Sequence, residues 1–550
     1  MEQAMKYLAS IIAMLIFPGT LAAQHGEHSP AKADGPASLM TGLGSLHHPV
    51  TTANTQAQRF FDQGLTLVYA FNHHEAIRSF KRAAELDPKL AMAYWGIALA
   101  TGPNYNMDVD PAREKEAFDA SQKARSLEGG ASPNETGYIE ALAQRYSDDS
   151  KADYSHLAMD YKNAMAALVK RFPDDLDAAA LYAESMMDLR PWRLWNSDGT
   201  PAEGTPEIVS VLESVLRRDP NHIGANHFYI HALEASPHAE KALASAGRLR
   251  TLAPEAGHLV HMPAHIYERT GDYAAAVASN EAGAAVDQEY IKTSGGNGMY
   301  PLMYYSHNLH FLAVAACMEG NFAKAKNATG LLADHLRPHL KDNAFSDAFM
   351  TAPILVLVRF HRWADILALE QPEADLPLTT VVWHFARGMA YAGLGQIDKA
   401  RAESAALHHA EEALPAGSDF GFSDAHTVFK IAENMLGAKL DLEKHDYDSA
   451  IGLFKQAVQI EDTLPYDEPP DWYLPSRESL GAVLYLNHNY TEAEAVFRAD
   501  LEAHPKSGRS LFGLMRTLTA VGKASEAREA GLRFRQAWRN ADTKLTIEDL

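Results

Sequence analysis

Small and large apolar residues recur along most of the chain with the spacing of paired amphipathic helices. In the segment that begins at Phe60, the key positions of a helix–turn–helix repeat of about 34 residues fall on Ala76, Phe80, Ala83 and Pro88. Small residues let two helices approach, the aromatic ring fills the gap between them, and proline ends the second helix. The pattern predicts one helical hairpin here.

The same register continues almost to the end of the chain. Turn segments with the same pattern lie at 271–276, 318–325, 393–400, 443–457 and 487–497. Strand-like alternation is almost absent, so the sequence predicts an all-α, right-handed superhelical solenoid of about ten hairpins over residues 56–540. We expect an N-terminal array at 56–290 and a C-terminal array at 306–550.

Three segments interrupt the period and are predicted to be inserted loops. The first, 190–206, carries Trp192 and Trp195; the second, 291–305, is glycine-rich; the third, 462–475, is rich in proline and aromatic residues. Long loops in a compact array are often binding loops or covers. The two tryptophans are therefore candidates for covering a binding groove.

The first residues are typical of a targeting signal. Lys6 precedes an apolar run that ends at Phe17, and small residues follow up to Ala23. This pattern predicts a bacterial secretory signal peptide over 1–22, a flexible lead-in over 23–55, and an exported protein, periplasmic or secreted. No later run is long and apolar enough to span a membrane.

Composition narrows the choice of partners and bonds. The formal net charge is −22 and no dense basic block is present, which argues against nucleic-acid binding. Cys317 is the single cysteine, so no disulfide can form within the chain. The oligomeric state stays open.

The 26 histidines are not scattered evenly over the repeat. The proline, glycine and alanine positions predict that the first helix of three successive repeats begins at residues 223, 257 and 306. In each of these helices, repeat positions 2, 5 and 9 lie on the predicted concave face. Seven of these nine positions are histidine, where chance would give fewer than one. They are His227, His231, His258, His261, His265, His307 and His310.

Imidazole is a common transition-metal ligand, and histidines at i and i+4 can chelate from one helix face. We expect His227, His231, His261 and His265 to converge on a divalent ion of Zn, Cu, Fe or Ni. A second subsite is predicted at His258, His307 and His310. Glu234 is a candidate base beside the metal, and Glu268 and Cys317 occupy equivalent positions of later repeats.

Two other interpretations of the histidines stay open. They can form a metal-free groove that binds an acidic peptide when protonated, or they can be buried groups with structural hydrogen bonds. Cys317 fits a small core residue better than a ligand.

The repeat resembles the tetratricopeptide repeat superfamily over most of the chain. Segments such as FDQGLTLVYAFNHHEAIRSF (61–80), NHFYIHALEAS (226–236) and GHLVHMPAHIYERTGDY (257–273) also look like exported bacterial repeat proteins of unassigned activity with an HMPxHIY motif. The resemblance implies the fold but no reaction. Typical members bind peptide termini with Lys, Arg and Asn, and histidine stands in their place here.

Two functions therefore remain for the sequence. The first is a metal-dependent hydrolase or oxidoreductase that acts on a small substrate in the groove. The second is a non-enzymatic scaffold of the cell envelope that binds a protein or peptide. Whether the protein is an enzyme is left open.

Overall fold

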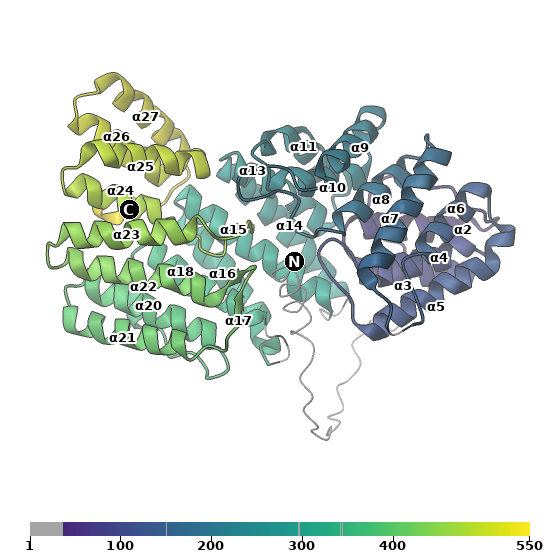
Figure 1. The fold of residues 1–550 in the computed structure, drawn as a ribbon, viewed down its shortest axis with the longest axis horizontal. Coiled ribbons are helices and arrows are strands. Elements are labelled where there is room, and N and C mark those ends of the chain that lie inside the picture. Colours follow the sequence, from purple (N-terminus) through teal and green to yellow (C-terminus); the bar gives the residue numbers. More distant parts are fainter. Residues whose placement is uncertain (1–36, 150, 295–297, 342, 344) are drawn as a thin grey trace.

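The protein is an all-α solenoid of stacked antiparallel helix pairs, as the sequence predicts (Figure 1). The computed structural model describes residues 37–550 except 150, 295–297, 342 and 344. The signal peptide predicted at 1–22 lies outside these residues. None of the described helices is long and apolar enough to span a lipid bilayer.

The N-terminal array and the middle of the chain hold the first thirteen α-helices of the described part. These are α2 (Thr55–Tyr69), α3 (His73–Leu86), α4 (Ala91–Thr101), α5 (Pro111–Leu127), α6 (Pro133–Ala143), α7 (Tyr154–Arg171), α8 (Leu176–Met187), α9 (Thr205–Arg218), α10 (Ile223–Glu234), α11 (Leu243–Leu252), α12 (Gly257–His261), α13 (Pro263–Arg269) and α14 (Tyr273–Ser294).

The C-terminal array follows a π-helical turn at Tyr300–Tyr305. Its helices are α15 (Ser306–Glu319), α16 (Phe322–Leu336), α17 (Ser346–Met350), α18 (Ala352–Arg359), α19 (Trp363–Leu367), α20 (Pro377–Gly393), α21 (Ile397–Glu412), α22 (Ala425–Leu442), α23 (Tyr447–Glu461), α24 (Ser476–Leu486), α25 (Tyr490–Ala503), α26 (Gly508–Ala520) and α27 (Ala524–Ala537). A two-stranded hairpin, β1 (Asp419–Phe420) and β2 (Ser423–Asp424), precedes α22.

Helices α10 to α14 lie between the two arrays. In Figure 1 the N-terminal helices α2 to α9 form the right-hand part, and the helices after α15 form the left-hand part. Residues from both arrays reach these central helices, Phe71 from the turn after α2 and Glu468 from the loop before α24.

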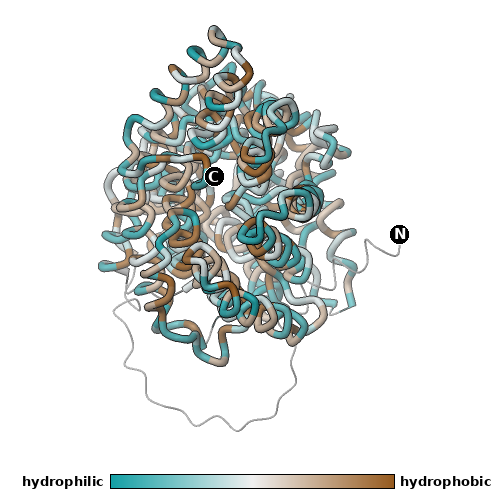
Figure 2. The backbone as a smooth tube through the Cα atoms, turned by 90° about the vertical axis from the view of Figure 1, so that its left-hand side faces the viewer, coloured by the Kyte–Doolittle hydropathy of each residue, from teal (hydrophilic) through white to brown (hydrophobic). Residues whose placement is uncertain are grey.

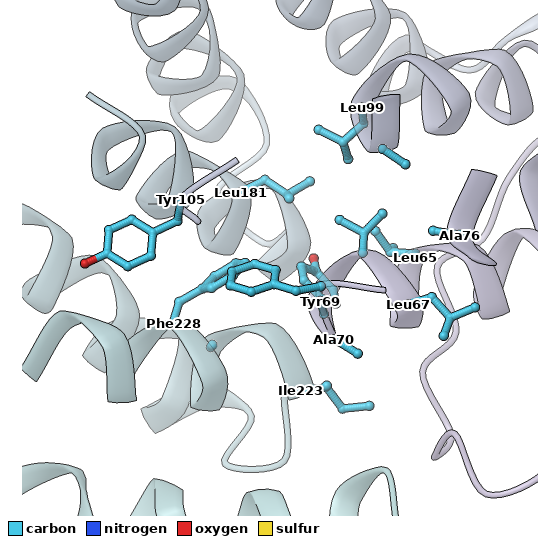
Figure 3. Close-up of a cluster of buried hydrophobic side chains, with 14 of the residues drawn as sticks. Leu65, Leu67, Tyr69, Ala70, Ala76, Leu99, Tyr105, Leu181, Ile223 and Phe228 are labelled. Carbon is cyan, nitrogen blue, oxygen red and sulfur yellow. The ribbon is translucent and has the colours of Figure 1, made fainter. Parts of the chain in front are cut away.

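The repeat positions pack as the sequence predicts. Phe80 is fully buried, and a Cβ atom added at Gly64 or Gly96 would lie within about 2.6 Å of its ring, so the glycines make room for it. Apolar residues alternate with polar ones along the helical tubes of Figure 2. Figure 3 shows one part of the core, where Tyr69 at the end of α2 lies beside Phe228 of α10.

The predicted register of the central repeats is confirmed. The helices α10, α12 and α15 begin at Ile223, Gly257 and Ser306, the residues chosen from the repeat pattern. Pro263 breaks the predicted helix of the second repeat into α12 and α13, because proline has no N–H to donate.

Two predicted segments differ from expectation. The described part of the lead-in is packed: Ala37, Leu43 and Val50 are buried, and the Thr51 backbone N–H donates to the carboxylate of Glu135 at 2.6 Å. Apolar side chains and backbone hydrogen bonds hold this part, so the prediction of a flexible segment is wrong there. The glycine-rich segment 291–305 is largely helical where it is described, because α14 runs on to 294 and the π-helical turn leads into α15.

Candidate metal centre

Six of the seven predicted histidines meet in two neighbouring groups. In each group every histidine offers a ring nitrogen, and these atoms lie within 4.8 Å of one another. The first triad is His227, His231 and His258, and the second triad is His261, His265 and His307. Both come from the central helices α10, α12, α13 and α15.

The first triad joins α10 to α12. One turn of helix separates His227 from His231, and their ring centroids lie 4.8 Å apart. His258 comes from the following repeat, with its ring centroid 5.0 Å from that of His227. All three side chains are buried.

Among the described residues, two ring nitrogens of the first triad have a hydrogen-bond partner. Nδ1 of His227 donates to the backbone carbonyl of Tyr69 at 2.7 Å, and Nδ1 of His231 donates to Oε1 of Glu234 at 2.8 Å. Nothing in the described part of the chain hydrogen-bonds the Nε2 atoms of these two residues or either nitrogen of His258. An unpartnered buried polar group costs about 1–3 kcal/mol, so this triad is arranged at the expense of stability.

The second triad spans α12, α13 and α15. Nδ1 of His261 donates to Oδ1 of Asn280 at 2.6 Å, and its Nε2 lies 3.0 Å from Nε2 of His265. His307, which is half-buried, lies with its ring centroid 4.9 Å from that of His261 and 5.6 Å from that of His265.

Two carboxylates contact the Nδ1 atom of His265. Its Nδ1 hydrogen-bonds Oε2 of Glu468 at 3.2 Å and lies 2.8 Å from Oε2 of Glu234, close enough for an ion pair. Glu468 comes from the loop before α24 and also accepts a hydrogen bond from Tyr466. Glu234 thus contacts one histidine of each triad.

Burial lowers the pKa of most of these imidazoles, in the second triad that of His261 to about 3 and that of His307 well below the ordinary value, and the carboxylates make His265 the exception. Burial holds the pKa of His227 and His258 well below the ordinary value, and neighbouring imidazoles add to the effect. Burial would also lower the pKa of His265, but Glu234 and Glu468 outweigh it and raise the pKa to about 10. Burial would raise the pKa of Glu234, yet His231 and His265 lower it to about 2. At neutral pH Glu234 is a carboxylate.

The donor set fits a divalent transition metal. A metal-binding histidine usually donates its other ring N–H to a carboxylate or carbonyl, which orients the ring and leaves the second nitrogen free to bind. His227 and His231 have this arrangement, and their Nε2 atoms have no hydrogen-bond partner in the described residues. Nδ1 of His261 and of His265 is held in the same way, but their Nε2 atoms face each other. A metal ion bound there would replace that contact and the extra proton of His265. Two ligands of one ion at about 2.0–2.1 Å lie roughly 2.8–3.4 Å apart, and the Nε2 atoms of His261 and His265 are 3.0 Å apart.

One phenylalanine packs against each triad. The Phe71 ring centroid lies 4.6 Å from His227, 5.7 Å from His231 and 5.5 Å from His258. The Phe311 ring centroid lies 5.3 Å from His261, 4.9 Å from His265 and 5.8 Å from His307. Both phenylalanines are buried, so apolar walls surround the imidazoles.

The first inserted loop covers one side of the first triad. The Trp192 ring contacts His231 edge-on at 5.7 Å between centroids and stacks on Tyr105 at 5.4 Å. Trp195 donates from its indole N–H to the backbone carbonyl of Ala232 at 2.8 Å and so fastens the loop to α10. The loop therefore lies over buried histidines. The predicted concave groove is corrected here, because five of the six triad histidines are buried and His307 is half-buried, so these side chains do not line a solvent-exposed groove.

Three predicted residues lie apart from the triads. The His310 ring packs against Phe349 and Tyr473 at 5.6 Å from each, and burial lowers its pKa to about 4. Cys317 is a buried residue of the apolar core, where burial raises the pKa of its thiol to about 12. Glu268 has a buried oxygen without a hydrogen-bond partner in the described residues, and burial and then the charge of Glu468 raise its pKa to about 8.

The predicted grouping was therefore only partly right. His227 and His231 do pair, as do His261 and His265, but the two pairs lie in different triads. His258 and His307 each complete one pair instead of forming a subsite with His310. The actual rule is that positions 5 and 9 of one repeat meet position 2 of the next.

The sequence did not reveal the groups that accept hydrogen bonds from the Nδ1 atoms of the imidazoles. Glu468 lies in a loop about two hundred residues away along the chain, and Asn280 lies on α14. The Tyr69 partner is a backbone carbonyl, which no sequence pattern identifies. The acidic residues in the loop 462–475 were the only available signal for Glu468.

Comparison with known proteins leaves the function open. No protein-family model and no curated protein sequence matches the chain. Among solved structures, the Cut9–Hcn1 hetero-tetramer of the APC/C is similar at 13% identity and a TM-score of 0.30, over 90% of this chain and 75% of that one. Yeast Tom70 is similar at 14% identity and 0.29, over 89% and 93% of the two chains. A human IFIT1 dimer with m7Gppp-AAAA is similar at 14% and 0.30, over 89% and 91%. At these TM-scores the function has to be argued from the site itself.

Proposed function

We propose that the protein binds divalent transition metal in the two histidine triads and uses it for chemistry on a small substrate. One observation carries the proposal: ring nitrogens of His227, His231 and His258 are buried, lie close together and have no hydrogen-bond partner in the described residues. A bound cation would compensate one nitrogen of each of the three rings at once. A solenoid that merely used histidines for internal hydrogen bonds would pair them.

The donor chemistry supports zinc, copper, iron or nickel over magnesium or calcium. Every proposed ligand is an imidazole nitrogen, and hard cations prefer oxygen ligands. The role of each neighbouring group follows from its contacts: Tyr69, Glu234 and Asn280 accept hydrogen bonds from Nδ1 atoms and leave Nε2 atoms directed away from them. When bound, the metal would supply Lewis-acid or redox chemistry.

The carboxylates beside the triads are engaged by the imidazoles. A metal ion can itself turn its bound water into a nucleophile at neutral pH, so a hydrolase and an oxidoreductase both fit the site. Glu234, the predicted base, is engaged by His231 and His265, and Glu468 is engaged by His265 and Tyr466. Both act as positioning residues in this proposal. We also propose export, on the predicted signal peptide at 1–22.

The test is metal analysis of the chain purified without a histidine tag. We expect transition metal bound to the wild-type protein, and none in the double variant His227→Ala/His265→Ala. The control is His156→Ala/His238→Ala, which removes two exposed histidines and should change nothing.

The wild-type protein alone provides a second test, which does not depend on how the variants fold. After treatment with a chelator, its melting temperature should rise with added Zn²⁺, Cu²⁺, Fe²⁺ or Ni²⁺ and not with Mg²⁺. Less than about 0.1 metal ion per chain with no such thermal shift would refute the proposal and leave the scaffold function.

A further inference from the structure

The two triads are built by the same rule of the repeat. Each takes the residues at positions 5 and 9 of one repeat and the residue at position 2 of the next. The rule stops after the second triad because position 9 of the third repeat is Val314, and His310 at position 5 is left among aromatic rings. The site is therefore duplicated along the solenoid.

The surroundings are duplicated as well. Phe71 packs against all three imidazoles of the first triad and Phe311 against all three of the second. One phenylalanine comes from the turn between α2 and α3 and the other from α15. Two unrelated segments thus provide the same apolar wall.

The triads are adjacent and share a carboxylate. The nearest rings across the boundary are His258 and His261, with centroids 5.9 Å apart, and His231 and His265 at 6.1 Å. Glu234 contacts Nδ1 of His231 with one oxygen and lies 2.8 Å from Nδ1 of His265 with the other. Glu234 thus links one histidine of the first triad to one histidine of the second.

One ion cannot satisfy all of these nitrogens. A tetrahedral ion takes four ligands, and six imidazoles are present. An ion held only by the second triad would leave His227, His231 and His258 with the unpartnered buried nitrogens described above. An ion held only by the first would leave three convergent imidazoles beside it, of which only His261 and His265 pair with each other through their Nε2 atoms.

We infer that the cluster is a dinuclear centre with one transition-metal ion in each triad and a small oxygen-donor ligand, such as hydroxide, shared between the ions. This inference rests on the proposed metal site and deepens it. Three protein ligands for each ion leave an open coordination position, as catalytic metal sites require. Two adjacent ions with open positions can share one small ligand.

Stoichiometry tests the number of ions. The metal-free protein is dialysed against Co²⁺ or Cu²⁺, unbound metal is removed, and metal per chain is measured. We expect two ions in the wild type and one in each of His258→Gln and His307→Gln. His310→Gln is the matched control on the same helix as His307 and should keep two. One ion per chain in the wild type would overturn the dinuclear centre alone, and no ion would overturn the metal site as well.

Spin counting tests the shared ligand and needs only the wild-type chain. With Cu²⁺ bound, a bridged pair should give much less than one electron spin per copper by electron paramagnetic resonance. The variants that hold one ion should give about one spin per copper. Two copper ions per chain with a full spin on each would overturn the shared ligand. Circular dichroism before and after loading checks that each variant is folded.

Discussion

The two triads follow one repeat rule but differ in what holds their imidazoles. In the first triad, His227 is oriented by the backbone carbonyl of Tyr69, and the ring nitrogens of His258 have no hydrogen-bond partner among the described residues. In the second, side chains do the orienting, through Asn280 for His261 and through Glu468 for His265. The first triad thus depends on a backbone carbonyl and on Glu234, which orients His231, whereas the second depends on side chains alone.

The triads also differ in how they exist without metal. Nε2 of His261 and Nε2 of His265 lie at hydrogen-bond distance from each other, so the second triad can satisfy these nitrogens internally. Within the part of the chain that the structure describes, the first triad has no such pair and leaves four ring nitrogens unpartnered. A metal ion therefore relieves a larger cost in the first triad, and we expect that triad to bind more tightly.

Substitution of the two phenylalanines that pack against the triads is expected to have the largest effect on stability. Phe71→Ala and Phe311→Ala should each lower the free energy of unfolding of the metal-free protein by about 3–5 kcal/mol, because each leaves a cavity in a buried site. Denaturant titration measures this. Metal analysis should then show that Phe71→Ala loses the ion of the first triad and Phe311→Ala that of the second. Phe497→Ala, a buried phenylalanine of the C-terminal array, should match their instability and keep both ions.

Substitutions of the two carboxylates should distinguish Glu234, which contacts both triads, from Glu468, which contacts only the second. Glu234→Gln is expected to weaken metal binding at both triads by about 10–100-fold, since it loses a charged acceptor for one histidine of each. Glu468→Gln should weaken only the second triad by a similar factor. Calorimetric titration in the His307→Gln and His258→Gln backgrounds measures the two triads one at a time. An unchanged first triad in Glu234→Gln would contradict the bridging role.

Asn280 should affect the second triad alone, by a smaller factor. Asn280→Ala removes the acceptor for Nδ1 of His261, and we expect roughly 10-fold weaker binding there. Asn280→Asp keeps an acceptor oxygen of the same reach and should restore most of the affinity. Equal losses in both variants would mean that packing around Asn280, and not its hydrogen bond, orients His261.

The histidine faces could be predicted from the sequence, and their grouping could not. The repeat pattern placed the starts of α10, α12 and α15 correctly, which put the histidines on one side. Which imidazoles meet depends on how consecutive repeats are offset, and on the break at Pro263. The helix periodicity of the sequence predicts neither the offset between repeats nor this break.

The burial of the site could not be predicted either. Phe71 has a positive φ of 54° and enters the cluster from a turn, and Glu468 enters from a distant loop. Helix patterns describe contacts within a repeat and between neighbours, whereas these two groups reach the site from irregular segments. The position rule seen here (5 and 9 of one repeat with 2 of the next) is the sequence signal that would have grouped the triads correctly.

The smallest difference between the triads is in the solvent exposure of their imidazoles. The first triad is buried throughout and covered by Trp192, whereas His307 of the second triad is half-buried. A chelator should therefore remove the second ion faster, because a ligand nearer to solvent detaches with less local opening. Trp192→Ala should speed release of the first ion several-fold and leave the second unchanged, as followed by stopped-flow absorption of Co²⁺ in the His307→Gln and His258→Gln backgrounds. Trp363→Ala, in the C-terminal array, is the control for loss of an indole. If Trp192→Ala accelerates both ions equally, the loop covers a single common entrance, and the two triads exchange metal as one unit.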